Sequence, residues 1–383
     1  MLKTYKFRIY PNKKQEIKLL ETLNLCRFTY NKQLELKINK YKENKVNLTQ
    51  FDLNNNLIIL KEENKELKQI HSQTLQDINK RISLAFNGFY RRLNKREQVG
   101  FPRFKSKYRY DSITYPQSGF KLENQLYISK IGQINIIKHR EIEGKVKTLT
   151  IKKTSTNKWF ACFSVEQESK SHSNLTNEET IGIDLGINHF YADSNGNLVD
   201  NPKYLRKSEL KLKKLQRKHS KKLKGSNNRN KSRLKLANLH ELISNQRNDF
   251  LHKQSRQLVN NYNTIVVERL QISNMTKNHY LAKSINDASW NKFLQLLSYK
   301  VEETGGKLVE IDPRNTSQLC ICGNKVEKSL ATRVHRCNNC GIEMDRDLMS
   351  ALIIKEKGIN DFSIITVGTT GIQACQRTSI EVQ

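Results

Sequence analysis

The chain has 383 residues, 36% of them hydrophobic, which leaves room for two or three domains with cores of their own. Its 68 Lys and Arg against 37 Asp and Glu give a formal charge of +31, which favours a polyanionic partner such as nucleic acid. No run approaches the roughly 18 apolar residues of a membrane span, and the first residues carry no signal-peptide core. These observations argue against membrane and secreted proteins, so we expect a soluble intracellular protein.

The first half of the sequence predicts a strand, a helical segment and then several short strands. Residues 3–10 alternate basic with apolar or aromatic side chains, as an exposed edge strand would, and Asn12 with Gln15 resembles a capping box. An apolar stripe steps by three and four residues from Leu75 to Leu93, so a helical lobe is expected before residue 99. Short alternating segments then indicate a small barrel or twisted sheet. The polar residues 168–180 are the best candidate for a linker, and Asn195-Gly196 indicates a hairpin.

Two segments are rich in basic residues. Residues 100–110 also carry aromatic rings, and could either stack bases and hold phosphates or form half-buried strands of the barrel. Residues 203–235 contain fifteen Lys and Arg against one Glu and lead into a helix. A solvated helix face would explain such a charge run, but its density favours contact with phosphates.

Three carboxylates stand at or beside the ends of short structural elements. Asp184 lies in I-G-I-D-L-G, Glu268 closes T-I-V-V-E, and Asp347 is expected in the first turn of a helix that Asp345 caps. The first two runs are too short for helices and predict buried strands, where an unpaired carboxylate is costly. Together the three match an RNase H-type nuclease core that binds two Mg²⁺ ions. The alternative is that Asp184 makes a turn and Glu268 pairs with a neighbour such as Arg269.

Four of the seven cysteines form two close pairs, Cys320 with Cys322 and Cys337 with Cys340. Without a secretion signal, clustered thiols favour a metal over disulfides, and four thiolates suit a structural Zn²⁺ ribbon. The second pair has the usual two-residue gap, whereas the first has a gap of one, which weakens the pattern. His335 is an alternative ligand, although a lone His among basic residues is expected at the surface.

In their order and spacing, these segments resemble the TnpB (OrfB) proteins of small bacterial insertion sequences, relatives of the type V CRISPR effector nucleases. One departure follows D-R-D, where the family commonly continues with x-N-A-A and this chain has Leu348-Met349-Ser350-Ala351. The resemblance covers nearly the whole chain and rests on Y-K-F-R-I-Y-P, C-R-F-T-Y-N, S-Q-T-L-Q-D, A-F-N-G-F-Y-R-R, G-F-P-R-F-K-S-K, I-G-I-D-L-G, I-S-N-Q-R-N-D-F-L-H-K, V-V-E-R-L, N-T-S-Q-L-C, D-R-D and T-V-G-T-T-G-I-Q-A-C.

The resemblance implies a mixed α/β, multidomain architecture. A wedge-type β-barrel would comprise residues 1–10 and 99–170, with a helical recognition lobe inserted at 11–98. A RuvC-like, RNase H-like nuclease domain would occupy residues 171–383 and carry a zinc ribbon inserted at 314–343. The basic segment from about 203 to 260 would be a helix along the guide-target heteroduplex.

The resemblance also implies an activity and its partners. The protein would be a metal-dependent endodeoxyribonuclease, guided by an RNA from the right end of the element, that cuts double-stranded DNA beside a short transposon-adjacent motif. It would act as a monomer in the bacterial cytoplasm, nucleoid-associated when bound to DNA, and without a membrane partner. The expected ligands are Asp184, Glu268 and Asp347 for two Mg²⁺ ions, and Cys320, Cys322, Cys337 and Cys340 for Zn²⁺. The residues expected to contact nucleic acid are Gln73, Gln76, Lys80, Arg103, Lys105, Lys221, Lys222 and Arg247.

Two alternatives stay open at this point. The first is an RNA-guided DNA-binding regulator with a silent nuclease, for which the Met349 departure would be the first suspect. The second is a DNA transposase that joins strands with the same three carboxylates and without any RNA.

Overall fold

The computed structural model describes residues 2–107, 109–167, 180–328 and 332–368, with side chains described up to residue 360. Contacts divide the chain into two compact units, Met1–Glu168 and Ser169–Gln383. The predicted linker at 168–180 lies outside the described residues except for its last position, and so do residues 369–375 of the closing motif. No helix within these described ranges is long and apolar enough to cross a membrane.

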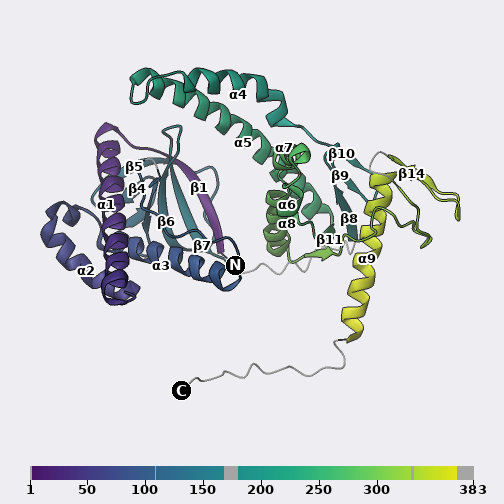
Figure 1. Ribbon diagram of the computed structural model, residues 1–383, viewed down its shortest axis with the longest axis horizontal. Coiled ribbons are helices and arrows are strands. Elements are labelled where there is room, and N and C mark those ends of the chain that lie inside the picture. Colours follow the sequence, from purple (N-terminus) through teal and green to yellow (C-terminus); the bar gives the residue numbers. More distant parts are fainter. Residues whose placement is uncertain (1, 108, 168–179, 329–331, 369–383) are drawn as a thin grey trace. The chain divides into compact units, whose positions relative to one another are not determined.

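The first unit combines helices with a seven-stranded antiparallel sheet in the order β2-β6-β7-β1-β5-β4-β3 (Figure 1). The strand predicted near the N-terminus exists, but its assignment to an edge is wrong, because β1 pairs with β5 and β7 on its two sides. Alternation of polar and apolar residues shows only that one face of a strand is buried. A central antiparallel strand has one buried face as well, so the pattern does not distinguish it from an edge strand. The elements are β1 (Leu2–Tyr10), α1 (Lys13–Asn44), α2 (Gln50–Glu63), η1 (Lys65–Gln69), α3 (Ser72–Asn94), β2 (Ser112–Tyr115), β3 (Phe120–Leu122), β4 (Leu126–Ile128), β5 (Gly132–Ile137), β6 (Lys145–Lys153) and β7 (Trp159–Glu166).

Aromatic rings fill the inside of this nearly closed sheet. Phe163 on β7 lies 6.1 Å from Phe7 on β1 and 6.4 Å from Phe120 on the distant edge strand β3, measured between ring centroids. The predicted capping box of Asn12 and Gln15 is confirmed at the start of α1. The predicted stripe on α3 is buried from Leu75 through Phe86. The sequence thus located α1 and α3 correctly, whereas it did not indicate α2 or the three-residue strand β3.

The aromatic and basic segment after α3 has no regular strand in its described residues, so its interpretation as barrel strands is wrong. Phe101 instead packs edge-on against Phe86 and Phe89 of α3, with centroids 5.6 and 5.4 Å apart. Asn31 of α1 fixes the backbone of Lys105 through two hydrogen bonds of 2.8 and 3.0 Å. Side-chain packing, rather than a ladder of backbone hydrogen bonds, orders this segment.

The second unit is built on a five-stranded sheet in the order β10-β9-β8-β11-β12. β9 is antiparallel to β8 and β10, whereas β8, β11 and β12 run parallel to one another. A separate two-stranded ribbon pairs β13 with β14. The elements are β8 (Thr180–Leu185), β9 (His189–Asp193), β10 (Leu198–Asp200), α4 (Tyr204–Ser220), α5 (Asn227–Asn261), β11 (Thr264–Glu268), α6 (Ile272–Met275), α7 (His279–Ala288), α8 (Trp290–Thr304), β12 (Lys307–Ile311), β13 (Val334–Arg336), β14 (Glu343–Asp345) and α9 (Arg346–Gly368).

Helices cover both faces of the five-stranded sheet (Figure 1). On one face, Ile181 and Ile183 of β8 join the apolar core that α5 and α8 supply through residues such as Leu251 and Phe293. On the other face, α9 crosses β8 and β11. The predicted hairpin at Asn195-Gly196 connects β9 to β10, with Gly196 at a φ of +92° that favours glycine.

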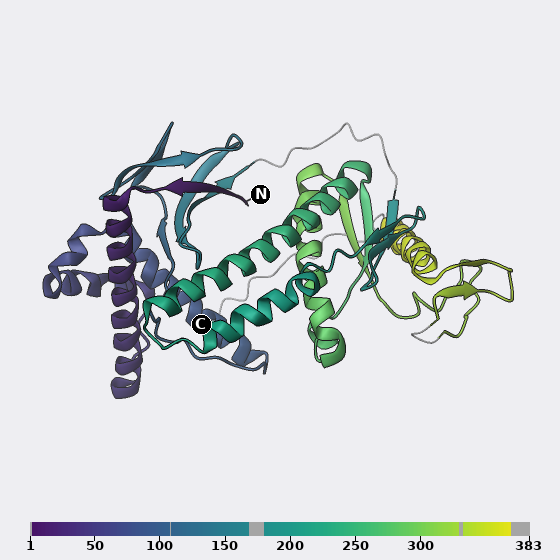
Figure 2. The ribbon, with the colours of Figure 1, turned by 90° about the horizontal axis from the view of Figure 1, so that it is seen from above.

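The basic segment from about 203 to 260 is two helices, so the prediction of one helix is wrong. α4 and α5 run side by side as an antiparallel hairpin (Figure 2), held by an apolar seam that includes Leu212, Leu239 and Ile243. The chain reverses at Gly225, whose φ is +85°, and Ser226 then caps α5 by accepting a hydrogen bond from the backbone of Arg229. Leu205, Leu212 and Leu215 within the lysine-rich stretch therefore belong to this seam, whereas Leu210 and Leu223 are exposed.

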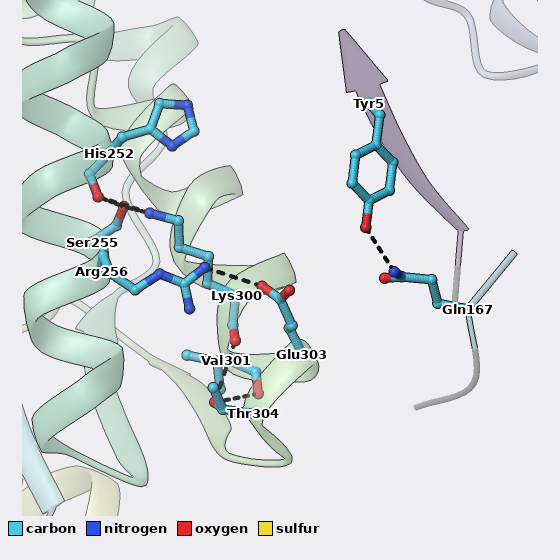
Figure 3. A network of polar contacts seen from close by, with 9 residues as sticks. All are labelled: Tyr5, Gln167, His252, Ser255, Arg256, Lys300, Val301, Glu303 and Thr304. Atoms are coloured by element: carbon cyan, nitrogen blue, oxygen red, sulfur yellow. Dashed lines mark hydrogen bonds and ion pairs between the residues drawn. The ribbon is translucent and has the colours of Figure 1, made fainter. Parts of the chain in front are cut away.

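A buried lysine joins α5 to α8 (Figure 3). The Lys300 ammonium is 2% exposed and donates to the carbonyl of His252 at 2.8 Å and to Ser255 Oγ at 2.7 Å. Burial, assisted by the nearby Arg256 guanidinium, lowers the pKa of Lys300 to about 8. Arg256 itself pairs with Glu303 at 3.1 Å. These contacts fix the two helices that support β8 and β11 from behind.

Candidate active site

Asp184 and Glu268 lie at neighbouring strand ends. β8 and β11 are parallel, with Ile183 opposite Val267 in the register, so the next residue on each strand is one of the two acids. Adjacent strands are about 4.8 Å apart. Both carboxylates are half-buried, and their strand assignments confirm what the apolar runs predicted. The interpretation of Asp184 as a turn residue is wrong, because it pairs with Ala192 of β9.

Asp347 reaches the same edge because α9 packs unusually close to β8. A Cβ atom on Gly182 would lie 2.3 Å from the carbonyl oxygen of Ala351, so only glycine permits this approach. Asp184 follows Gly182 by two strand residues, and Asp347 precedes Ala351 by one helical turn. As predicted, Asp345 caps α9 by accepting hydrogen bonds from the backbone N–H groups of Asp347 at 2.8 Å and Leu348 at 3.4 Å.

The charges of Glu268 and Asp347 both act on Asp184. Burial, followed by the charges of Glu268 and Asp347, raises the pKa of Asp184 well above its usual range. The Arg346 guanidinium opposes this shift and contacts Asp347 Oδ1 at 3.3 Å through both Nε and Nη2. The carboxylate oxygens of these acids are the ligand type that a hard divalent cation prefers. The donor set therefore fits Mg²⁺.

A threonine that the sequence did not single out holds Glu268. Thr316 is 2% exposed, and its hydroxyl is hydrogen-bonded to Glu268 Oε1 and lies 2.9 Å from the carbonyl oxygen of Pro313. Burial raises the pKa of Glu268, against the effects of Thr316 and Lys357. The interpretation that Glu268 pairs with Arg269 is wrong, because Arg269 pairs with Glu310 at 3.5 Å. The N-T-S-Q-L motif was the available sequence signal for Thr316, but it does not indicate that this residue contacts Glu268, 48 residues away.

The four predicted zinc ligands lie together. Their sulfur atoms are all within 4.8 Å of one another, with Cys320 and Cys340 3.5 Å apart and Cys322 and Cys337 3.6 Å apart. A tetrahedral Zn²⁺ with bonds of about 2.3 Å places sulfurs about 3.8 Å apart, so this cluster can hold zinc. The short Cys320–Cys322 gap therefore does not prevent convergence. Four thiolates leave no open position, which indicates a structural role.

The expectation that His335 lies at the surface is wrong, since it is fully buried in β13. It is not part of the four-thiol cluster. β13 is paired with β14, which continues directly into α9. Met349, where the family commonly has Asn, is fully buried in a small core with Cys320, Cys337 and Ile353. The cysteine cluster thus packs against the helix turn that carries Asp347.

The eight residues predicted to contact nucleic acid divide between the two units. Gln76 and Lys80 are exposed on α3, whereas Gln73 Oε1 accepts hydrogen bonds from the backbone and hydroxyl of Ser118 at 3.2 and 3.0 Å. Arg247 is engaged in an ion pair with the buried Asp287 at 2.7 Å. Arg103 is exposed, Lys105 is half-buried, and Lys221 and Lys222 are exposed in the turn between α4 and α5.

Comparison with known proteins identifies the family. A relative from Streptomyces pristinaespiralis, named "Putative RNA-guided DNA endonuclease", is 33% identical over 93% of this chain and 89% of its own length. The chain belongs to the TnpB (OrfB) family. The Escherichia coli K12 protein named "Putative RNA-guided DNA endonuclease InsQ" is 30% identical over 93% of this chain and 92% of its own length. A "TnpB-like protein" of Methanocaldococcus jannaschii is 30% identical over 36% of this chain and 34% of its own length.

Family models agree with this membership along the chain. The model described as "Probable transposase" matches residues 162–279, the "Cas12f1-like, TNB domain" matches residues 290–354, and a "Helix-turn-helix domain" matches residues 1–46. A solved "Cas12f1-sgRNA-target DNA complex" aligns with 93% of this chain and 99% of that chain, at 15% identity and a TM-score of 0.35. That score is too low to support a structural argument, so the membership rests on sequence.

The cysteine cluster gives a first prediction. Replacing Cys337 by Ser should remove the zinc and lower the melting temperature, because three thiolates hold the ion poorly and the small core beneath α9 loses its anchor. Elemental analysis and thermal unfolding measure both effects. Cys162→Ser, a change on β7 outside the cluster, should retain one zinc per chain. Equal zinc content in the two variants would contradict the assignment.

Proposed function

We propose that this TnpB-family protein is an RNA-guided, Mg²⁺-dependent endonuclease that cuts double-stranded DNA. The observation that carries the proposal is the position of Asp184, Glu268 and Asp347 at one sheet edge, where burial and then the charges of Glu268 and Asp347 raise the pKa of Asp184. The sheet order β10-β9-β8-β11-β12, in which β9 runs antiparallel to the other four strands, supports assigning the second unit to the RNase H-like, RuvC class.

The three carboxylates would hold two Mg²⁺ ions, which when bound supply an activated water and stabilise the leaving oxygen. Thr316 would keep Glu268 in its ligating orientation through the hydroxyl contact. Asp345 would hold the first turn of α9, and so the position of Asp347, through its backbone hydrogen bonds. Arg346 would partly neutralise the cluster before the metals bind. The cysteine cluster would bind Zn²⁺ and act on the position of α9, without taking part in the chemistry.

We infer the binding partners of the protein from its net charge and from its family. A formal charge of +31 suits a permanently bound RNA, and the names of the two full-length relatives describe RNA guidance and DNA cleavage for those proteins. We extend both to this chain, with the guide transcribed from the right end of the element and a short adjacent motif read beside the target. Exposed Gln76, Lys80, Arg103, Lys221 and Lys222 are suited to contact phosphates or base edges.

The proposal places the wedge sheet and recognition helices in the first unit, and the nuclease with its inserted ribbon in the second.

A nuclease-silent regulator is the second candidate, because Met349 stands where the family commonly has Asn. Its side chain is buried against the cysteine cluster, so the position serves packing in this chain. No carboxylate of the triad is missing, which favours the active enzyme.

Plasmid cleavage tests the proposal directly. The protein copurified with its right-end RNA is given a guide-matched target beside a randomised flank, with Mg²⁺ or EDTA. We expect cleavage only with Mg²⁺ and the matched guide, and loss of at least 10³-fold in Asp184→Asn because a metal ligand is removed. Asp200→Asn, an exposed residue of β10, is the control. Guide-dependent binding without cleavage would support the regulator, and strand transfer without RNA would support a transposase.

Thr316 gives a separate prediction about metal affinity. Thr316→Val should raise the Mg²⁺ concentration needed for half-maximal cleavage by about tenfold or more, because outer-shell hydrogen bonds orient metal ligands. Thr316→Ser keeps the hydroxyl and should stay close to wild type. A Mg²⁺ titration of the initial cleavage rate distinguishes the two. The role of Thr316 is refuted if the valine and serine variants titrate alike.

A further inference from the structure

A polar cavity of about 390 Å³ lies in the second unit, between the turn after β8, the start of α4, and α7. Ile187 and Asn188 contribute the β8–β9 turn, and Tyr280 and Ser284 contribute one wall from α7. Ile187 is only three residues after Asp184, at most about 11 Å of extended chain. The cavity therefore opens at the same strand end as the candidate active site.

The acidic side chains of this cavity are already paired with cations. Glu209 accepts hydrogen bonds from Lys213 at 2.8 Å and from Lys283, and these lower the pKa of Glu209 to about 2. Asp287 is buried and accepts hydrogen bonds from the backbone of Leu205 at 3.1 Å and from Arg247 at 2.7 Å. The two acids are thus engaged in fixing α4 against α5 and α7, and neighbouring cations offset their charges.

The rest of the cavity wall carries cationic and hydrogen-bonding side chains. The side chains of Lys203 and Arg206 line the cavity and have no acidic partner among the residues that the structure describes. Asn188 and Ser284 add amide and hydroxyl groups. Such a lining combines positive charge with donors and acceptors, as required by a phosphodiester joined to a nucleobase.

Tyr280 adds a stacking surface. It is 81% exposed at the start of α7, so its ring is accessible to a ligand in the cavity. Its ring centroid lies 3.9 Å from that of His279, with the two rings tilted by 36°, so the imidazole packs against the tyrosine ring and supports it. Bases of single-stranded nucleic acid stack on such exposed aromatic rings irrespective of sequence.

We propose that this cavity binds one nucleotide of the single DNA strand being cut, within about three nucleotides of the scissile phosphate. The base stacks on Tyr280, and Lys203 and Arg206 hold the adjoining phosphate. This inference rests on the proposed nuclease function and adds a substrate subsite to it. It assigns the site to the DNA strand rather than to a free nucleotide.

The test places 2-aminopurine, a base whose fluorescence stacking quenches, at successive positions of the target strand. The strand is bound to Asp184→Asn protein assembled with its guide RNA, so that it stays intact. We expect quenching at one position near the scissile phosphate, lost in Tyr280→Ala and kept in Leu281→Ala. Leu281 is the matched control, since it is exposed on the same helix and does not line the cavity. In otherwise wild-type protein, Tyr280→Ala should slow cleavage about tenfold.

Each outcome decides a separate question. Quenching that persists in Tyr280→Ala, or is lost equally in Leu281→Ala, would overturn the subsite. Deoxyadenosine monophosphate that abolishes the quenching at micromolar concentration would also overturn it, in favour of a free-nucleotide site. If the wild type does not cut but quenching still depends on Tyr280, the subsite stands and the nuclease proposal fails. Normal cutting by Tyr280→Ala overturns the subsite alone.

Discussion

The close packing of α9 on β8 at Gly182 is the contact on which the candidate site depends. A helix normally stands away from a sheet because side chains fill the space between them. Here the backbone of Ala351 and Lys355 would lie within 2.5 Å of any Cβ at position 182, so a side chain would push the helix away. Asp347 would then move away from Asp184, even if the rest of the fold were unchanged.

The rest of the second unit supports this contact from two directions. Behind the sheet, the packed α5 and α8 helices hold β8 and β11, with the buried Lys300 bridging them (Figure 3). In front, the cysteine cluster packs on Met349 and its ribbon strand β14 leads into the first turn of α9. These two sets of contacts hold in place the elements that carry Asp184, Glu268 and Asp347, although the charges of Glu268 and Asp347 oppose ionisation of Asp184. The framework therefore tolerates an unfavourable charge arrangement that metal ions would offset.

The sequence predicted what depends on local pattern. Strand-end Asp184 and Glu268, the helix cap at Asp345 and the clustered thiols are confirmed, because each follows from a short run and its flanking residues. Contacts between distant segments could not be predicted in this way. Thr316 reaches Glu268 across 48 residues, and the hairpin of α4 and α5 depends on leucines within a charge run. His335 was misplaced because neighbouring basic residues say nothing about packing between a ribbon and a helix.

The most direct test of the account is the thermal stability of wild type and Asp184→Asn, each in EDTA and in Mg²⁺. Because the folded protein raises the pKa of Asp184, ionisation of this carboxyl lowers stability as pH increases from about 4, the pKa of an unfolded Asp, through the raised folded value. At neutral pH in EDTA, the asparagine variant should therefore melt several degrees above wild type. Mg²⁺ should stabilise wild type and leave the variant nearly unchanged. Equal melting temperatures in EDTA together with equal Mg²⁺ shifts would contradict a metal site built from mutually repelling carboxylates.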